Sequence, residues 1–463
     1  MSVAAVCRAR GATFSMKACA LLLGGVLVSQ ASVAHPNGES VWFHAARVPP
    51  ANGGAGDTPA QREVASFAAF IPLSGPFADQ LADATRLRAQ LADLEERGEQ
   101  YSPQFAELSE QLGRALQAKG EHRAALAAFD RGFQVNRRQE GLHSPMQAAL
   151  LRAQIDSQLA LGDVEAVDLL QHALFSMQQE LLTADPAAMA AAHRDAADWN
   201  ILYYLQMQQV AIPGGITQAE QHARAERLGT ALGQYHRALW LLTTAAPPGA
   251  YDARAAIERR IAAVMLLTDR QFQLNAPALL SKPGLANLHQ DKRTHNPALF
   301  AHGSAALQRA AAYGADSAEP AQRATRQLEL ADWYLLMDQH DSARDAYNAA
   351  LATLRAANVP EQQLQEVVES GMPVRDPERE LRALAQPGAG DFDGYIDVAF
   401  DVDRYGKAHN ARVLASADYD AAYDHALENE LLREIHGTRF RPGFRGDVPV
   451  ASKDVTLRYY YAR

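Results

Sequence analysis

Three carboxylates at even spacing are the residues in this sequence best suited to acid–base chemistry. Asp397, Asp401 and Asp403 lie in residues 394–403, where polar and small residues alternate with apolar ones. Paired carboxylates act as general acid and base when burial raises the pKa of one of them. A period of two instead predicts a strand with one dry and one wet face, so we expect these carboxylates to be solvated.

The remaining motifs also argue against catalysis. His289, His295 and His302 lie near Asp291, but zinc ligands usually come in closer pairs on a fixed element, so we expect an exposed polar loop. The sequence holds no phosphate-binding glycine loop, no nucleophile elbow and no H-E-x-x-H motif. We therefore expect no enzyme activity, no cofactor and no metal ion.

The elements after the first strand predict a small α+β unit. Gly406 lies in the turn at 404–407, where glycine adopts positive φ without strain. A helix is expected over residues 421–435 and a last strand over 455–461. Between the turn and the helix, a second strand has alternating small and apolar residues at Ala411, Val413 and Ala415.

This order of hairpin, helix and strand resembles the C-terminal domain of the TonB family. The resemblance rests on residues 394–403, on Gly406, on Arg-Phe-Arg-Pro at 439–442 and on Asp-Val-Pro-Val at 447–450. It covers residues 394–463, less than a sixth of the chain. It implies a small peptide-binding domain rather than an enzyme.

The final strand is the predicted binding site. A three-stranded sheet has edges whose N–H and C=O groups can pair with an extended peptide. The resemblance implies pairing of this kind with a short segment of an outer-membrane receptor. The alternative is a structural strand whose edge the linker or a second copy covers. The predicted edge strand consists of Lys453, Asp454, Val455, Thr456, Leu457, Arg458, Tyr459, Tyr460 and Tyr461.

Three arginines, Arg439, Arg441 and Arg445, precede this strand. Clustered arginines can bind acidic groups of a partner. They can also balance the acidic strand and helix of their own domain. We favour the second interpretation, because exposed charge clusters usually serve solvation.

The middle of the chain is expected to form helical repeats. In residues 106–137, small Gly113 and Ala125 and large Leu116 and Phe129 have the spacing of a tetratricopeptide repeat. Small residues suit the point where two helices cross, and large ones fill the gap between them. Further matches, one in the same register and one poorer, lie at 324–355 and 148–179.

The repeats predict an irregular helical solenoid over residues 77–357, with a concave face for a peptide or protein. Residues 185–275 are expected to hold long helices, as degenerate repeats or plain hairpins. We expect the aromatic side chains of the helices to lie mostly in the core, with a binding hot spot as the minority alternative. These are Trp199, Tyr203, Tyr204, Trp333 and Tyr334.

The N-terminus is typical of a secretory signal peptide over residues 1–34. Basic residues precede a short apolar run, and small residues end it. The run is shorter than the roughly 20 residues of a spanning helix, so we expect cleavage rather than an anchor. Cys7 and Cys19 both lie within the expected signal peptide, so its removal would leave the mature chain without thiols. We expect a loosely ordered lead-in at 35–76 and a linker at 358–393.

Together these features predict a periplasmic adaptor that binds protein or peptide partners through its repeats and its sheet edge. The alternative is a TonB-type energy transducer that supports transport through an outer-membrane receptor. It would require the N-terminal signal to be kept as a membrane anchor. A net charge of −10 argues against nucleic acid and anionic lipid as main partners.

Overall fold

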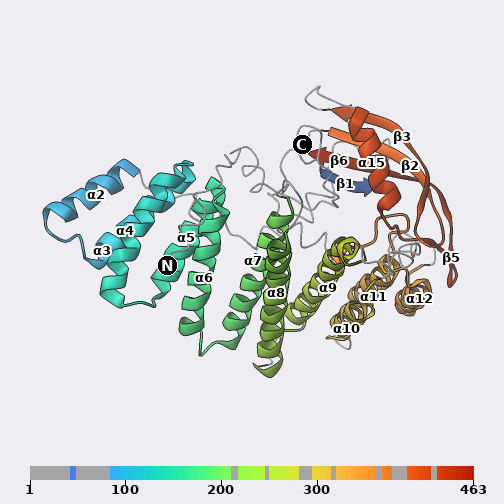
Figure 1. Ribbon diagram of the computed structural model, residues 1–463, viewed down its shortest axis with the longest axis horizontal. Helices are drawn as coiled ribbons and strands as arrows, with labels where there is room; N and C mark the ends of the chain where they lie inside the picture. Colours follow the sequence, from blue (N-terminus) through green and yellow to red (C-terminus); the bar gives the residue numbers. More distant parts are fainter. Residues whose placement is uncertain are drawn as a thin grey trace. The chain divides into compact units, whose positions relative to one another are not determined.

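The computed structural model describes residues 42–47, 84–209, 217–245, 250–280, 295–313, 320–360, 364, 368–377, 394–418 and 425–462. These residues are mostly helical, with a small antiparallel sheet in the C-terminal region (Figure 1). The expected signal peptide lies outside them. Two compact units emerge: one holds the helices up to Leu174, and the other holds the remaining helices and all strands.

The first unit consists of helical hairpins. Its elements are α2 (Ala84–Glu96), α3 (Pro103–Ala118), α4 (His122–Glu140), α5 (Pro145–Leu161) and most of α6 (Val164–Leu181). Gly113 of α3 lies against Phe129 of α4 so closely that a Cβ there would be 2.2 Å from the ring. Ala125 and Leu116 are also buried. The packing expected at this crossing is therefore confirmed. Gly120 and Gly162, in the turns that follow α3 and α5, have positive φ.

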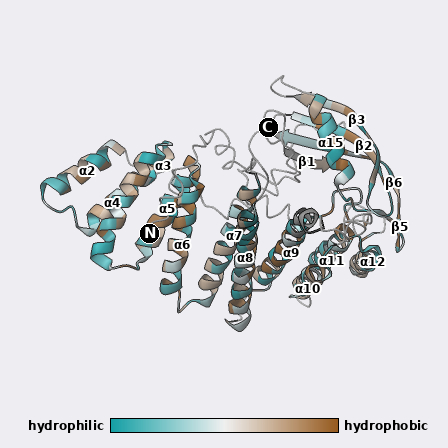
Figure 2. Cartoon of the chain, viewed as in Figure 1, coloured by the Kyte–Doolittle hydropathy of each residue, from teal (hydrophilic) through white to brown (hydrophobic). Residues whose placement is uncertain are grey.

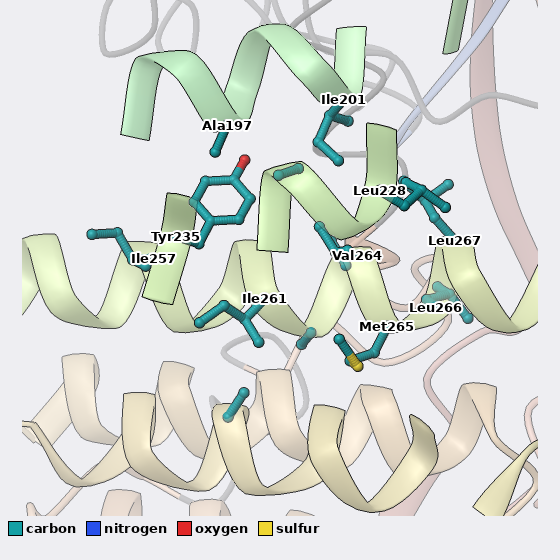
Figure 3. Close-up of a cluster of buried hydrophobic side chains, with 14 of the residues drawn as sticks. Ala197, Ile201, Leu228, Tyr235, Ile257, Ile261, Val264, Met265, Leu266 and Leu267 are labelled. Carbon is teal, nitrogen blue, oxygen red and sulfur yellow. The ribbon is translucent and has the colours of Figure 1, made fainter. Parts of the chain in front are cut away.

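The helices of the second unit after α6 bury one large core, to which all but the last of them contribute. They are α7 (Pro186–Gln209), α8 (Gln218–Ala245), α9 (Ala250–Leu280), α10 (Pro297–Ala312), α11 (Pro320–Leu336) and α12 (His340–Ala356). Figure 3 shows Tyr235 of α8 and Ile261 of α9 in this core, with Ala197 of α7 facing the Tyr235 ring. The Tyr235 hydroxyl donates to Asp198 Oδ1 over 2.5 Å.

Three of the five aromatic side chains expected in the helical core are buried. Trp199, Tyr204 and Trp333 are buried, whereas Tyr203 and Tyr334 are half-buried. Polar and apolar residues are interspersed along the helices in Figure 2, as amphipathic helices that bury one face require. None of the described helices is long and apolar enough to cross a membrane.

The sheet comprises four strands in the order β1-β6-β2-β3, all antiparallel. The strands are β1 (Trp42–Arg47), β2 (Gly394–Val402), β3 (Ala408–Asp418) and β6 (Ser452–Ala462). A two-stranded hairpin of β4 (Gly443–Arg445) and β5 (Val448–Val450) precedes β6, and α15 (His425–Gly437) follows β3. We call these strands and α15 the sheet module.

Alternation in β2 produces the core of the sheet module. Ile396, Val398, Phe400 and Val402 are fully buried. They pack with Leu427, Leu431 and Ile435 of α15. In the turn after β2, Gly406 has φ +76°, and a Cβ there would lie 2.4 Å from the carbonyl oxygen of Phe440. The expected hairpin, helix and final strand are therefore confirmed, with the helix beginning at His425 among the described residues.

The close contact between Gly303 of α10 and Trp333 of α11 can be tested by substitution. A Cβ at Gly303 would lie 2.3 Å from the ring of buried Trp333, whereas Gly233 of α8 has no heavy atom within 4 Å of that position. We expect Gly303→Ala to lower the free energy of unfolding by about 1–3 kcal/mol through overpacking. The matched control Gly233→Ala should raise it by about 0.5–1 kcal/mol through helix propensity. Urea denaturation followed by circular dichroism measures both, and equal midpoints would contradict this packing.

Candidate functional site

The predicted edge strand is an inner strand over most of its length. On one side β2 pairs with it from Ser452 to Tyr461. On the other side β1 pairs with it from Leu457 to Ala462, beginning with Trp42 opposite Ala462 and ending with Arg47 opposite Leu457. The expectation of a three-stranded sheet with a free edge at residues 457–461 is therefore wrong. The reason is that a segment more than 300 residues away in sequence, expected to be a loose lead-in, adds a fourth strand (Figure 1).

The part of β6 beyond β1 is short and irregular. Lys453 and Asp454 are exposed, and Val455 and Thr456 are half-buried. Asp454 has φ +51°, which interrupts the extended backbone that strand pairing needs. A Cβ at Gly371 would lie 2.9 Å from Val455, so that side chain is covered from within the chain. The regular portion of this edge is thus the portion that β1 occupies.

The two faces of β6 have different chemistry. Leu457, Tyr459 and Tyr461 are buried in the core under α15. On the opposite face, the Arg458 guanidinium donates to both carboxylate oxygens of Asp397 over 2.8 and 2.9 Å. It also lies 3.8 Å from the centroid of the Tyr395 ring. The hydrogen bond to Asp397 raises the pKa of Arg458 above its ordinary value.

The three aspartates of residues 394–403 all accept hydrogen bonds within the sheet module. Asp397 is buried, so the expectation of a solvated carboxylate there is wrong. Asp401 accepts from the Asn410 amide over 2.8 Å and from the Asp454 backbone over 3.0 Å, and these bonds lower its pKa. Asp403 accepts from the backbone N–H groups of the turn, at Tyr405 and Lys407.

A buried ion pair joins the sheet module to the last helical hairpin. Arg441 and Asp332 of α11 have side chains 2% and 0% exposed. Arg441 Nη2 donates to Asp332 Oδ2 over 2.7 Å, and Nε donates to Oδ1 over 3.0 Å. Asp332 Oδ1 also accepts from the Tyr347 hydroxyl of α12 over 2.6 Å. Burial alone lowers the pKa of Arg441, but the Asp332 carboxylate raises it more, so the guanidinium stays charged.

The expectation that the arginines balance their own acidic strand and helix is therefore wrong for two of the three. Arg439 pairs with Asp338, at the end of α11, and Arg441 pairs with Asp332. Both partners belong to the helical hairpin, because the segment 439–441 lies between that hairpin and the sheet module. Arg445 is exposed.

Part of the expected linker belongs to the same interface. The Gly371 N–H donates to the Arg441 carbonyl over 2.8 Å, and the Val374 N–H donates to the Arg439 carbonyl over 3.0 Å. Arg441 Nη1 donates to the Val368 carbonyl over 3.0 Å. Residues 368–377 are thus a built part of the fold, and the linker expectation is wrong for them. Residues 378–393 lie outside the described parts of the chain.

Phe444 completes this contact. It lies in the core formed by α11 and α12, with its ring 5.2 Å from that of Tyr347. On the surface, Arg355 of α12 donates to Asp447 over 2.8 Å. The hairpin of β4 and β5 is therefore fixed to α12 by an apolar anchor and a surface ion pair.

The histidine group has no metal-site geometry among the described residues, where no three potential ligands come together. His295 Nδ1 lies 2.7 Å from Asp269 Oδ2, and the Asn296 N–H donates to the other oxygen of that carboxylate. This arrangement holds the start of α10. His289 and Asp291 lie in residues 281–294, outside the described parts.

Sequence reasoning missed two functional elements. A short run with two aromatic residues in a Pro- and Gly-rich lead-in was the available signal for β1. Asp332 lies among Leu328, Ala331 and Leu335, the buried stripe of α11. A carboxylate on an apolar stripe is the sequence signal for a buried charge that needs a partner.

Comparisons with known proteins add little to this geometry. No protein-family model matches the chain, and no curated protein matches it by sequence. Among solved structures it is similar to BtubC (BKLC) from P. vanneervenii, with 14% sequence identity and a TM-score of 0.33. That match covers 62% of this chain and 94% of BtubC. A similarity this weak carries no argument about function.

The ion pair supports a direct stability test. Arg441→Met leaves Asp332 charged and buried without its main partner, and breaking a buried pair in this way typically costs about 3–5 kcal/mol. The control Arg412→Met removes the exposed pair with Asp454, which should cost less than about 1 kcal/mol. Urea denaturation measures both changes. Equal losses in the two variants would show that the buried pair does not hold the module.

His340, the first residue of α12, lies at the same interface with its ring 4.8 Å from that of Tyr405. Burial lowers its pKa from the ordinary value. The charged groups facing it are Asp338, Arg439, Lys407 and Asp403.

This lowered pKa predicts a pH dependence. Neutral His340 is favoured in the folded chain, so its contribution is present above the ordinary histidine pKa of about 6.5 and is lost as the pH falls through the lowered value. His340→Gln should therefore lose less stability than the wild type between pH 7 and pH 5. Thermal unfolding at both pH values checks this, with His425→Gln, which is exposed, as the control. An identical pH slope in wild type and His340→Gln would contradict the prediction.

Proposed function

We propose that this chain is a periplasmic protein–protein interaction protein, an adaptor that binds one partner on its helical repeats and another on its sheet module. The observation that carries the proposal is the β1–β6 pairing. The edge of β6 takes up an extended segment, Trp42–Arg47, from a distant part of the chain. An edge with this property offers main-chain hydrogen bonds to any extended peptide of suitable side chains.

The proposal also includes the family that each part of the chain resembles and the strand on which a peptide docks. The sheet module resembles the C-terminal domain of the TonB family in its order of hairpin, helix and last strand, with peptide docking at Lys453–Tyr461. The helical hairpins are proposed to be repeats of the tetratricopeptide type. Equivalent small and large residues are buried in both hairpins, Ala125 and Phe129 in α4 and Ala343 and Tyr347 in α12, which supports this proposal.

The rigid junction suits an adaptor. Arg441, Asp332 and Phe444 fix the sheet module to α11 and α12 through buried contacts. A partner held on the module is thereby held at a set position relative to that hairpin. We propose binding rather than catalysis as the chemistry of these surfaces, in line with the extended segment that the β6 edge takes up.

Photocrosslinking in cells tests the proposal. A photoreactive residue at Thr456, next to the part of β6 that pairs with β1, should capture a protein partner. The same photoreactive residue at exposed Asn429 of α15 should not. Capture at both positions or at neither would contradict docking at β6. The N-terminus of the same protein separates the two functional classes. A start near His35 supports the adaptor, and an intact, membrane-pelleting N-terminus supports an energy transducer.

A further inference from the structure

The β1 strand is an edge strand that comes from a distant part of the chain and pairs with β6. Among the side chains that the structure describes, Ala45 is the β1 residue that lies in the core of the sheet module, 8% exposed. The rest of that core comes from β2, α15 and β6, with Ala408 at the start of β3 and Phe440 ahead of β4. Among the described side chains, those of β2, β6 and α15 therefore form most of this core.

Backbone pairing attaches β1 to β6 along its whole length. Six consecutive residues pair antiparallel with Leu457–Ala462. No other described strand borders β6 on this side. Pairing of one added strand at a sheet edge is the geometry of peptide capture by β-augmentation. The chain thus occupies its own docking edge.

We propose that β1 is a replaceable occupant of the β6 edge, which a partner peptide must displace in order to bind. This inference rests on the proposed function and deepens it. While β1 is paired, the edge is available only in the fraction of molecules in which β1 has detached. The apparent dissociation constant of a partner rises by the inverse of that fraction. The N-terminal segment is then an autoinhibitory strap.

The seated strand also defines the partner. Ala45 lies opposite Tyr459, and both side chains are buried. The competing segment is therefore extended, runs antiparallel to β6 and carries a small residue opposite Tyr459. We assign it to another protein rather than to a second copy of this chain, because each copy uses its own β1 and has no spare strand.

A matched pair of substitutions in the full mature chain tests the inference. Ala45→Gln places an amide at a buried position, which weakens β1 pairing, whereas Ala46→Gln places it at a half-buried position opposite Arg458. The probe is a fluorescent peptide with the sequence of residues 40–49, titrated by anisotropy. We expect it to bind Ala45→Gln about ten-fold more tightly than the wild type. It should bind Ala46→Gln as it binds the wild type.

Equal affinity for all three proteins would overturn the inference. Because Ala45→Gln could also disturb the sheet, hydrogen exchange on the wild type supplies a second measurement. Amides of β1 should exchange well before those of β2, through local release of the strand. Exchange of both strands at one rate would make β1 an integral strand and overturn the inference. So would a wild-type dimer that the peptide dissociates, because the occupant would then be a second copy.

These outcomes are separable from failure of the proposed function. The probe carries the sequence of this chain and needs no cellular partner. Tight binding to Ala45→Gln with no crosslinked partner at Thr456 would leave the strap in place and remove the adaptor proposal. A crosslinked partner at Thr456 together with equal peptide affinity in all three proteins would support the adaptor proposal and remove the strap.

Discussion

A buried charge that must be neutralised governs the C-terminal half of this protein. Arg441 and Asp332 are removed from water almost completely, and each would be costly to bury alone. Their pairing is satisfied only when the segment before β4 lies against α11. The Tyr347 hydroxyl donates a further hydrogen bond to Asp332, and the Val368 carbonyl accepts one from Arg441. The sheet module is therefore a docked part of the helical hairpin rather than an appendage.

This junction determines what the rest of the module can do. The segment 439–441 is held on one side by α11 and on the other by backbone bonds to 371–374. Phe440 within it packs on Phe400 of β2, with ring centroids 4.6 Å apart. The sheet is thereby anchored through β2, with β6 and then β1 on the side of β2 away from β3.

Local pattern was sufficient to predict much of this fold. The alternation in β2, the glycine turn at 406 and the final strand follow from side-chain periodicity and backbone sterics, which act over a few residues. The hairpin of α3 and α4 follows in the same way, because Gly113 and Phe129 must be small and large at one crossing. The expectation that the Asp397 carboxylate would be solvated is wrong, because alternation predicts only the face of the sheet on which a residue lies and not what covers that face. On that outer face Arg458 pairs with Asp397 and lies over the Tyr395 ring.

The sequence by itself predicted most of the elements: the helices, the strands β2, β3 and β6 and the turn at Gly406. It also predicted a sheet near the C-terminus whose last strand has an unpaired edge. The tertiary structure alone decided the occupant of that edge and the partner of Arg441. Both choices join residues about 100 or more positions apart, Arg441 with Asp332 and Leu457 with Arg47. Periodicity describes how a segment buries one face, but it does not identify the distant segment that will meet it.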